Sequence, residues 1–112
     1  MAKKKIDIGR FTKEIVIGNY GTEIVECIPT KVWQEKVNCF GDVKPLSLRK
    51  TEVISAEGHV GFNCKEFIIR DEFGEISYSD IIRYNENDYN IIAIEPSEDD
   101  MFLYITGERV MS

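Results

Sequence analysis

The sequence predicts a mainly β domain, a small antiparallel β-barrel of about six strands with one inserted short helix or long loop between strands two and three. Two observations carry this prediction. β-Branched and aromatic residues gather in short runs separated by Asn, Asp, Ser, Gly and Pro, which is typical of consecutive antiparallel strands. A proline also interrupts a long strand candidate, and a bend of this kind curls a small sheet toward a barrel.

The length of 112 residues is that of one domain, and the absence of any repeat or linker predicts that residues 1–112 form a single unit. No apolar run approaches the roughly 18 residues that a membrane helix needs. The lysine-rich start has no apolar stretch behind it, so it does not resemble a signal peptide. We therefore expect the protein to stay in the cytoplasm where it is made.

The first third of the chain predicts strands on either side of a turn. Lys13 to Gly18 reads as a short strand, and Asn19 to Thr22 reads as a turn because Asn and Gly tolerate positive φ. Glu23 to Cys39 is a long extended candidate. Because a proline removes a donor from the sheet ladder, we read this stretch as one strand bent at Pro29 or as two strands in succession.

The segment from Phe40 to Phe62 is different in character. Within it, Leu46 to Glu57 predicts at most a short helix, with Gly58 as a possible stop. A connection of this length is long for a compact domain, and such insertions tend to be functional or mobile. We take this segment to be the working part of the molecule; an ordinary connecting helix packed on the sheet is an equally good alternative.

The strand pattern resumes at Asn63 to Arg70, and Ile76 to Ser79 predicts a further small strand. Asp80 to Ile105 then predicts a meander of three strands. Its turns are expected at Asn85 to Asp88 and at Glu95 to Asp100, where polar residues separate the apolar runs.

The net charge of −6 is unevenly spread. Residues 1 to 70 carry 12 basic and 9 acidic side chains, whereas residues 71 to 112 carry 2 basic and 11 acidic ones. An acidic chain without a basic, aromatic-laced patch argues against tight nucleic-acid binding. The asymmetry either guides copies of the domain together through surfaces of opposite sign or simply aids solubility.

The sequence contains no recognisable catalytic set. The one histidine, His59, lies between glycines with no motif around it, so neither serine nor cysteine catalysis has a plausible base. The run Glu98 to Asp100 lacks the glycine and the spaced ligands of a calcium loop. No phosphate-binding motif is present. We expect an assembly or binding module, not an enzyme, with no metal and no cofactor.

The three cysteines, Cys27, Cys39 and Cys64, include no pair at CxxC spacing. A structural zinc site usually shows such pairs. We therefore expect small reduced side chains in or near the core.

Three pieces of the sequence, spread over nearly the whole chain, share the order and spacing of one known family. The opening piece is Gly9-Arg10-Phe11 with Ile15 and Ile17, the middle piece is Val32-Trp33 with Val37, and the last is Asp80, Ile82, Tyr84, Tyr89, Ile91 and Ile94. The pattern resembles the head–tail connector family of long-tailed phages, also known as head-completion, stopper or head-tail joining proteins.

The resemblance implies a structural role in virion assembly. Members of this family are similar to small β-barrels that form a ring at the head–tail interface, retain packaged DNA and dock the tail. Implied partners are other copies of the chain, a portal-adaptor ring above and a tail protein below. DNA would pass through without sequence-specific binding, and no membrane is involved. The implied location is the host cytoplasm during assembly and then the neck of the virion.

The resemblance also implies that Phe40 to Phe62 corresponds to a segment that faces the channel and acts as a gate. Its charged side chains and its histidine are the candidate channel, gating or interface residues: Asp42, Lys44, Arg49, Lys50, Glu52, Glu57 and His59.

Two rival functions remain open. One is another neck component, such as a tail terminator or an adaptor, although an adaptor is expected to be mostly helical. The other is a small SH3-like or OB-type barrel that binds a peptide or an oligonucleotide. Base-stacking aromatics beside basic residues would favour that barrel, whereas the aromatics of the meander lie among acidic residues.

Overall fold

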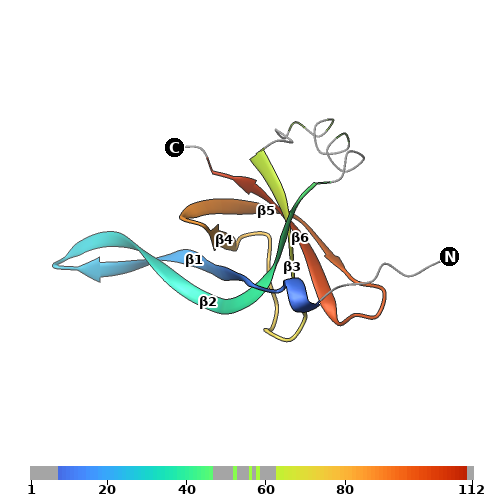
Figure 1. Ribbon diagram of the computed structural model, residues 1–112. Coiled ribbons are helices and arrows are strands. Elements are labelled where there is room, and N and C mark those ends of the chain that lie inside the picture. The colour runs from blue at the N-terminus through green and yellow to red at the C-terminus, as the bar shows by residue number, and fades with distance from the viewer. Residues whose placement is uncertain (1–7, 47–51, 53–55, 57, 59–62, 111–112) are drawn as a thin grey trace.

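The computed structural model describes residues 8–46, 52, 56, 58 and 63–110. Its strands form one antiparallel sheet that closes into a barrel in the order β1-β2-β3-β6-β5-β4 (Figure 1), which confirms the predicted fold class. A short 3-10 helix, Ile8–Arg10, precedes the sheet. The strands are β1 (Lys13–Val25), β2 (Ile28–Pro45), β3 (Cys64–Arg70), β4 (Ile81–Tyr84), β5 (Asn87–Pro96) and β6 (Phe102–Arg109).

The core fills the inside of this ring. Ile15 and Ile17 alternate along β1 and are fully buried, as the two-residue period of a strand requires. Phe67 on β3 is equally buried and makes edge-on ring contacts with Tyr84 and Tyr89, with centroids 5.8 and 5.1 Å apart. Each of these positions belongs to a strand that the sequence predicts.

The turn expected at Asn19 to Thr22 is wrong, because β1 runs straight through it. The turn lies at Glu26 and Cys27, whose φ angles are 51° and 66°. The glycines before it serve close packing instead: a Cβ on Gly18 would collide with the backbone carbonyl oxygen of Gln34. Glycine inside a strand also often marks a β-bulge. The register between β1 and β2 does shift between Ile17 and Gly18.

Pro29 neither bends nor breaks a strand. It is the second residue of β2 and faces Ile24 of β1. Alternate pairs of an antiparallel ladder direct their N–H and C=O groups toward each other and away from each other. The pair Val25 and Ile28 flanks a two-residue turn and is directed inward, so the next pair is directed outward. The N–H that proline lacks is therefore one that the hairpin does not use.

The meander is confirmed as β4, β5 and β6, but the small strand expected at Ile76 to Ser79 is wrong. This stretch is held in a local turn, because the Ser77 N–H donates to the Asp80 carboxylate at 2.9 Å and the Asp80 N–H donates to the Ser77 carbonyl at 3.0 Å. A side chain that binds nearby backbone competes with strand pairing in this way.

The inserted segment begins later than the expected start at Phe40. Phe40 to Pro45 continue β2, pairing first with β1 and then, from Asp42 onward, with β3. The insertion thus lies between Pro45 and Cys64, still between strands two and three. Most of it falls outside the described residues.

A two-stranded arm extends beyond the barrel (Figure 1). We define the arm as residues 19–25 of β1 and 28–34 of β2, with their connecting turn. β4 pairs with β1 only over Val16 to Gly18, and β3 pairs with β2 only over Asp42 to Pro45. Among the described residues, each strand of the arm therefore pairs only with the other, and its outer edge is free (Figure 1). The arm gives the molecule an elongated shape of 59 × 31 × 21 Å.

Candidate functional site

The tip of the arm exposes apolar side chains on both of its faces. Residues that face each other across an antiparallel pair point to the same side. One face of the tip therefore carries Ile24 and Pro29, and the other carries Val25 and Ile28. The exposed fractions of Ile24, Val25 and Ile28 are 77%, 48% and 63%. Such a cluster is unusual in a chain whose barrel has a well-filled core.

Four side chains from four strands meet where the arm leaves the barrel, and we call them the root cluster: Tyr20 on β1, Trp33 on β2, Arg83 on β4 and Asp88 on β5. The Arg83 guanidinium lies 3.8 Å from the centre of the Trp33 ring, within the range of a cation–π contact. The rings of Tyr20 and Trp33 meet edge-on at 5.3 Å.

Hydrogen bonds close the root cluster. Arg83 donates from Nε to Asp88 Oδ1 at 3.0 Å and from Nη2 to Tyr20 Oη at 2.7 Å, and the Tyr20 hydroxyl donates to Asp88 Oδ2 at 3.2 Å. Burial lowers the pKa of Arg83, but its bonds to Tyr20 and Asp88 outweigh this and hold the pKa above its usual value. The guanidinium is thus a fixed charge that ties both strands of the arm to β4 and β5.

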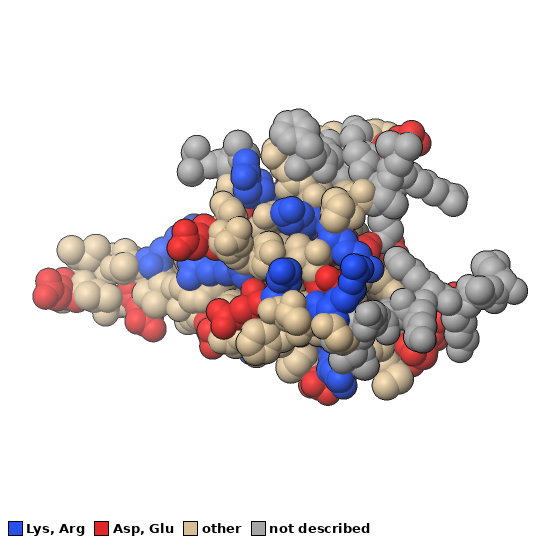
Figure 2. Space-filling view, in the orientation of Figure 1, with Lys and Arg blue, Asp and Glu red and all other residues tan. Residues whose placement is uncertain are grey.

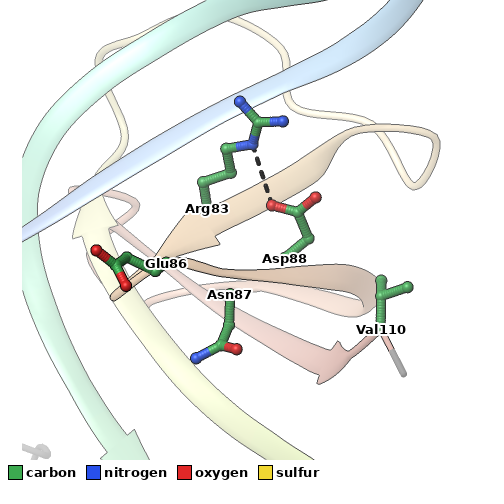
Figure 3. Close-up of a pocket in the computed structure, with 5 residues that line it drawn as sticks. All are labelled: Arg83, Glu86, Asn87, Asp88 and Val110. Carbon is green, nitrogen blue, oxygen red and sulfur yellow. Dashed lines mark hydrogen bonds and ion pairs between the residues drawn. The ribbon is translucent and has the colours of Figure 1, made fainter. Parts of the chain in front are cut away.

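Figure 3 shows an open hollow beside the root cluster, with Arg83 and Asp88 pointing toward each other. Glu86, Asn87 and Val110 complete its lining. Asn87 donates from Nδ2 to the Asn85 carbonyl at 3.1 Å. Arg83 and Asp88 thus already bind each other, Asn87 binds the backbone, and Arg83 covers one face of the Trp33 ring.

A second anchor lies on the other side of the arm's base. The Asp80 carboxylate is buried and accepts from Lys36 Nζ at 2.9 Å, from Asn19 Nδ2 at 3.4 Å and from the Ser77 N–H at 2.9 Å. Burial alone would raise the pKa of Asp80, but these hydrogen bonds and the Lys36 charge together hold it below its usual value. The loop before β4 is thereby fastened to both β1 and β2.

The predicted gating residues are only partly described. Asp42 and Lys44 lie on the barrel part of β2 and form an ion pair of 3.7 Å, with Asp42 buried. Glu52 is exposed. The other four predicted residues lie outside the described part of the chain: Arg49, Lys50, Glu57 and His59.

The cysteines divide into two kinds. Cys39 and Cys64 are buried as expected, and burial, with a smaller effect of Glu72 on Cys39 and of Glu108 on Cys64, raises the pKa of each thiol to about 11. For Cys27 the expectation of a place in or near the core is wrong, because this residue occupies the turn at the tip of the arm and is exposed. Among the described residues, no group of three or more His, Cys, Asp or Glu side chains is arranged to hold a metal ion.

Sequence reasoning missed both the arm and its root cluster. The sequence places Trp33 in an extended segment but indicates no partner for it. One usable signal was available: Arg83 is one of only two basic residues after Asp71, and it stands inside an apolar run. An isolated arginine in such a place indicates a specific planar or acidic partner. The partners themselves come from strands far apart in the sequence, so their identity needed the fold.

No family model matches the chain, and no curated protein sequence matches it either. Among solved structures, the chain is similar to the solution structure of protein SF1141 from Shigella flexneri 2a, a structural genomics target. The TM-score is 0.65 at 19% sequence identity, over 93% of this chain and 96% of that chain. The likeness shows that the fold is shared. Within the described residues, no helix is long and apolar enough to cross a membrane.

Proposed function

We propose that this chain is a structural subunit of a phage head–tail connector, one of several copies that form a ring, retain packaged DNA and dock the tail. The observation that carries the proposal is the arm. Its tip exposes Ile24, Val25 and Ile28 to water, although the barrel of the same chain has a filled core. Exposed apolar clusters of this kind mark protein–protein contacts.

The architecture of the chain supports an assembly role. The closed barrel leaves few free strand edges, and the arm concentrates those that remain. A free edge accepts a strand of another chain by backbone hydrogen bonds. A ring of weakly adhering copies gains avidity once a template holds the copies together. Rigid barrels with a projecting contact element are well suited to such an assembly.

The sequence supports the assignment to a head–tail connector in particular. The three matching pieces resemble the head–tail connector family, and the insertion between β2 and β3 corresponds to the segment that lines the channel in that family. The acidic balance of the chain also suits a channel that passes DNA without gripping it. The proposal includes no enzymatic step.

The test is removal of the gene from its phage or prophage, followed by induction and electron microscopy of the lysate. The proposal predicts finished tails beside unattached heads, many of which have lost their DNA. Complementation with the intact gene restores whole particles. Normal particles in the deletion strain would refute the proposal and turn attention to the peptide- or oligonucleotide-binding barrel.

A second strain separates gating from docking. Deletion of residues 46–58 removes most of the insertion while β2 and β3 keep their pairing with each other and with their neighbours. We expect loss of DNA retention with tails still able to attach. Heads that keep their DNA in this strain would remove the gating role of the insertion.

A further inference from the structure

The tip of the arm has apolar side chains on both faces, and this restricts the shape of any surface that can cover it. Ile24 and Pro29 point to one side, and Val25 and Ile28 point to the other. A single flat surface covers one side of a two-stranded ribbon and leaves the other in water. With exposed fractions of 77% for Ile24 and 63% for Ile28, both sides of the tip are open in the isolated chain. The surface that receives the tip must therefore enclose it.

The barrel of the same chain does not fill this role. The root cluster fixes the arm through Arg83, and the Asp80 anchor fixes the base of the arm through Asn19 on β1 and Lys36 on β2. These contacts hold the arm pointing away from the barrel (Figure 1). A contact element that is already held in its extended form loses little conformational freedom on binding. The arm is thus built to bind another molecule.

Charge and reach favour a second copy as that molecule. From Thr22 to Thr30 the arm carries Glu23 and Glu26 and no basic residue. Figure 2 shows acidic side chains at the far end of the arm and, on the face of the barrel in view, several Lys and Arg side chains interspersed with acidic ones. Residues 19–25 at roughly 3.3 Å each reach about 23 Å, which is comparable with the two shorter dimensions of the molecule, 31 and 21 Å. The arm is therefore about as long as the body of another copy is thick.

We propose that the tip of the arm is buried on both faces by other copies of this chain, with its acidic residues against Lys and Arg side chains on one face of their barrels. This inference rests on the proposed function, because it assigns the arm to the contacts between copies in the ring. The contact joins unlike surfaces, arm to barrel, and such head-to-tail contacts generate rings when the rotation closes.

The native Cys27 is a reporter at the tip, since Cys39 and Cys64 are buried with thiol pKa values raised to about 11. The first measurement is the rate at which Cys27 reacts with iodoacetamide in the dilute chain, in the concentrated chain and in purified virions. We expect about tenfold slower reaction in virions or in the concentrated chain, because an enclosed thiol is shielded from reagent. Cys27→Ser identifies the signal of the other two thiols.

A pair of matched variants tests enclosure. Ile24→Asp alters one face of the tip and Ile28→Asp alters the other, and Met101→Asp, at another exposed apolar site with 60% exposure, is the control. We expect each arm variant to weaken association by about tenfold or more, the cost of placing a charge in an apolar contact. The Met101→Asp variant should associate normally. A loss with only one of the two arm variants would mean that the tip lies on a single surface and would overturn the inference.

A cross-linking experiment on a mixture of labelled and unlabelled chains identifies the molecule that covers the tip. Unlabelled and ¹⁵N-labelled chains are mixed, assembled and treated with a thiol-to-amine cross-linker. We expect Cys27 of one isotope joined to lysines of the other. Cross-links to a different virion protein alone, or a Cys27 that reacts in virions as fast as in the dilute chain, would overturn the inference. Both outcomes leave the proposed function standing, since the gene deletion decides that function regardless of how the copies touch.

Discussion

Lys36 Nζ lies 2.9 Å from Asp80 Oδ2, and the two side chains differ sharply in exposure, at 35% and 1%. The carboxylate is thus a buried charge whose partner reaches it from the surface. Ser77 and Asn19 supply its other hydrogen bonds. Asp80 therefore links the loop before β4 to β1 and β2 at the point where the arm begins.

Substitution of Asp80 by Asn tests this link. The amide keeps the shape of the carboxylate but removes the charge that Lys36 pairs with, so we expect a loss of about 1.5 to 3 kcal/mol in the free energy of unfolding. Urea titration measures it. The control is Asp88→Asn at a more exposed ion pair, where the loss should stay below about 1 kcal/mol. Equal losses at the two positions would contradict the special role of Asp80.

The same carboxylate predicts a pH dependence. The pKa of Asp80 is held below its unfolded value of about 3.9. The unfolded chain thus binds the proton more tightly than the folded chain, and the stabilisation is complete above the unfolded pKa and disappears as the pH falls through the folded pKa. We expect the stability difference between the wild type and Asp80→Asn to shrink from about pH 5 toward pH 2. A difference that stays constant over this range would show that Asp80 has no lowered pKa.

The root cluster predicts control of the arm's direction. Arg83→Ala removes the contacts to Tyr20, Trp33 and Asp88, and because this cluster is partly exposed we expect a stability loss of only about 1 kcal/mol. The larger effect should be positional. With spin labels at Cys27 and at Glu98→Cys, pulsed electron paramagnetic resonance should show a broader distance distribution in Arg83→Ala. Arg70→Ala, at an exposed arginine on β3, should leave the distribution narrow.

The turn between β4 and β5 predicts a stabilising change. Asn85 and Glu86 have φ angles of 51° and 65°, a region that costs residues with a Cβ atom. Glycine at position 86 relieves this cost, so we expect Glu86→Gly to raise the free energy of unfolding by about 1 kcal/mol. Thermal unfolding checks this result. Glu86→Ala keeps the Cβ and should bring no gain; an equal gain from alanine would mean that the side chain, and not the backbone, is responsible.

The three thiols predict selective chemistry. With the pKa of Cys39 and Cys64 raised to about 11, only about 0.1% of each is thiolate at pH 8. Alkylation followed by mass spectrometry should therefore modify Cys27 first, and the other two only after unfolding. Early modification of Cys39 in the folded chain would show that the barrel opens more readily than its packing suggests.

The meander could be predicted from the sequence because its signals are local. Each strand from Ile81 to Arg109 is joined to the next by a short turn, and polar residues such as Asn85 mark those turns. The turn between β1 and β2 could not be located from the sequence. Glu26 and Cys27 carry no turn preference, whereas Gly21, which does, lies inside β1 with the flexible end of the Gln34 side chain packed over it. Pairing energy over a long hairpin outweighs the local cost of such a turn.

The candidate site was harder to predict for a related reason. The insertion stands out in the sequence by its length, and its charged residues remain predictions because most of them lie outside the described part of the chain. Arg83 and Trp33 lie fifty positions apart in the sequence, and their contact exists only because the barrel places β4 beside β1. Side-chain clusters built across strands leave no spacing pattern, so the sequence alone does not reveal them.

The two-residue turn at Glu26 and Cys27 joins two paired strands, and this pairing restricts how the arm can vary in length. Adding one residue to each strand would move the root cluster and the tip out of phase, so that the side chains of Ile24 and Pro29 would change places with those of Val25 and Ile28. Adding two residues to each strand restores the phase and lengthens the arm by roughly 6.6 Å. Natural variation in the length of the arm should therefore come in blocks of four residues, two in each strand.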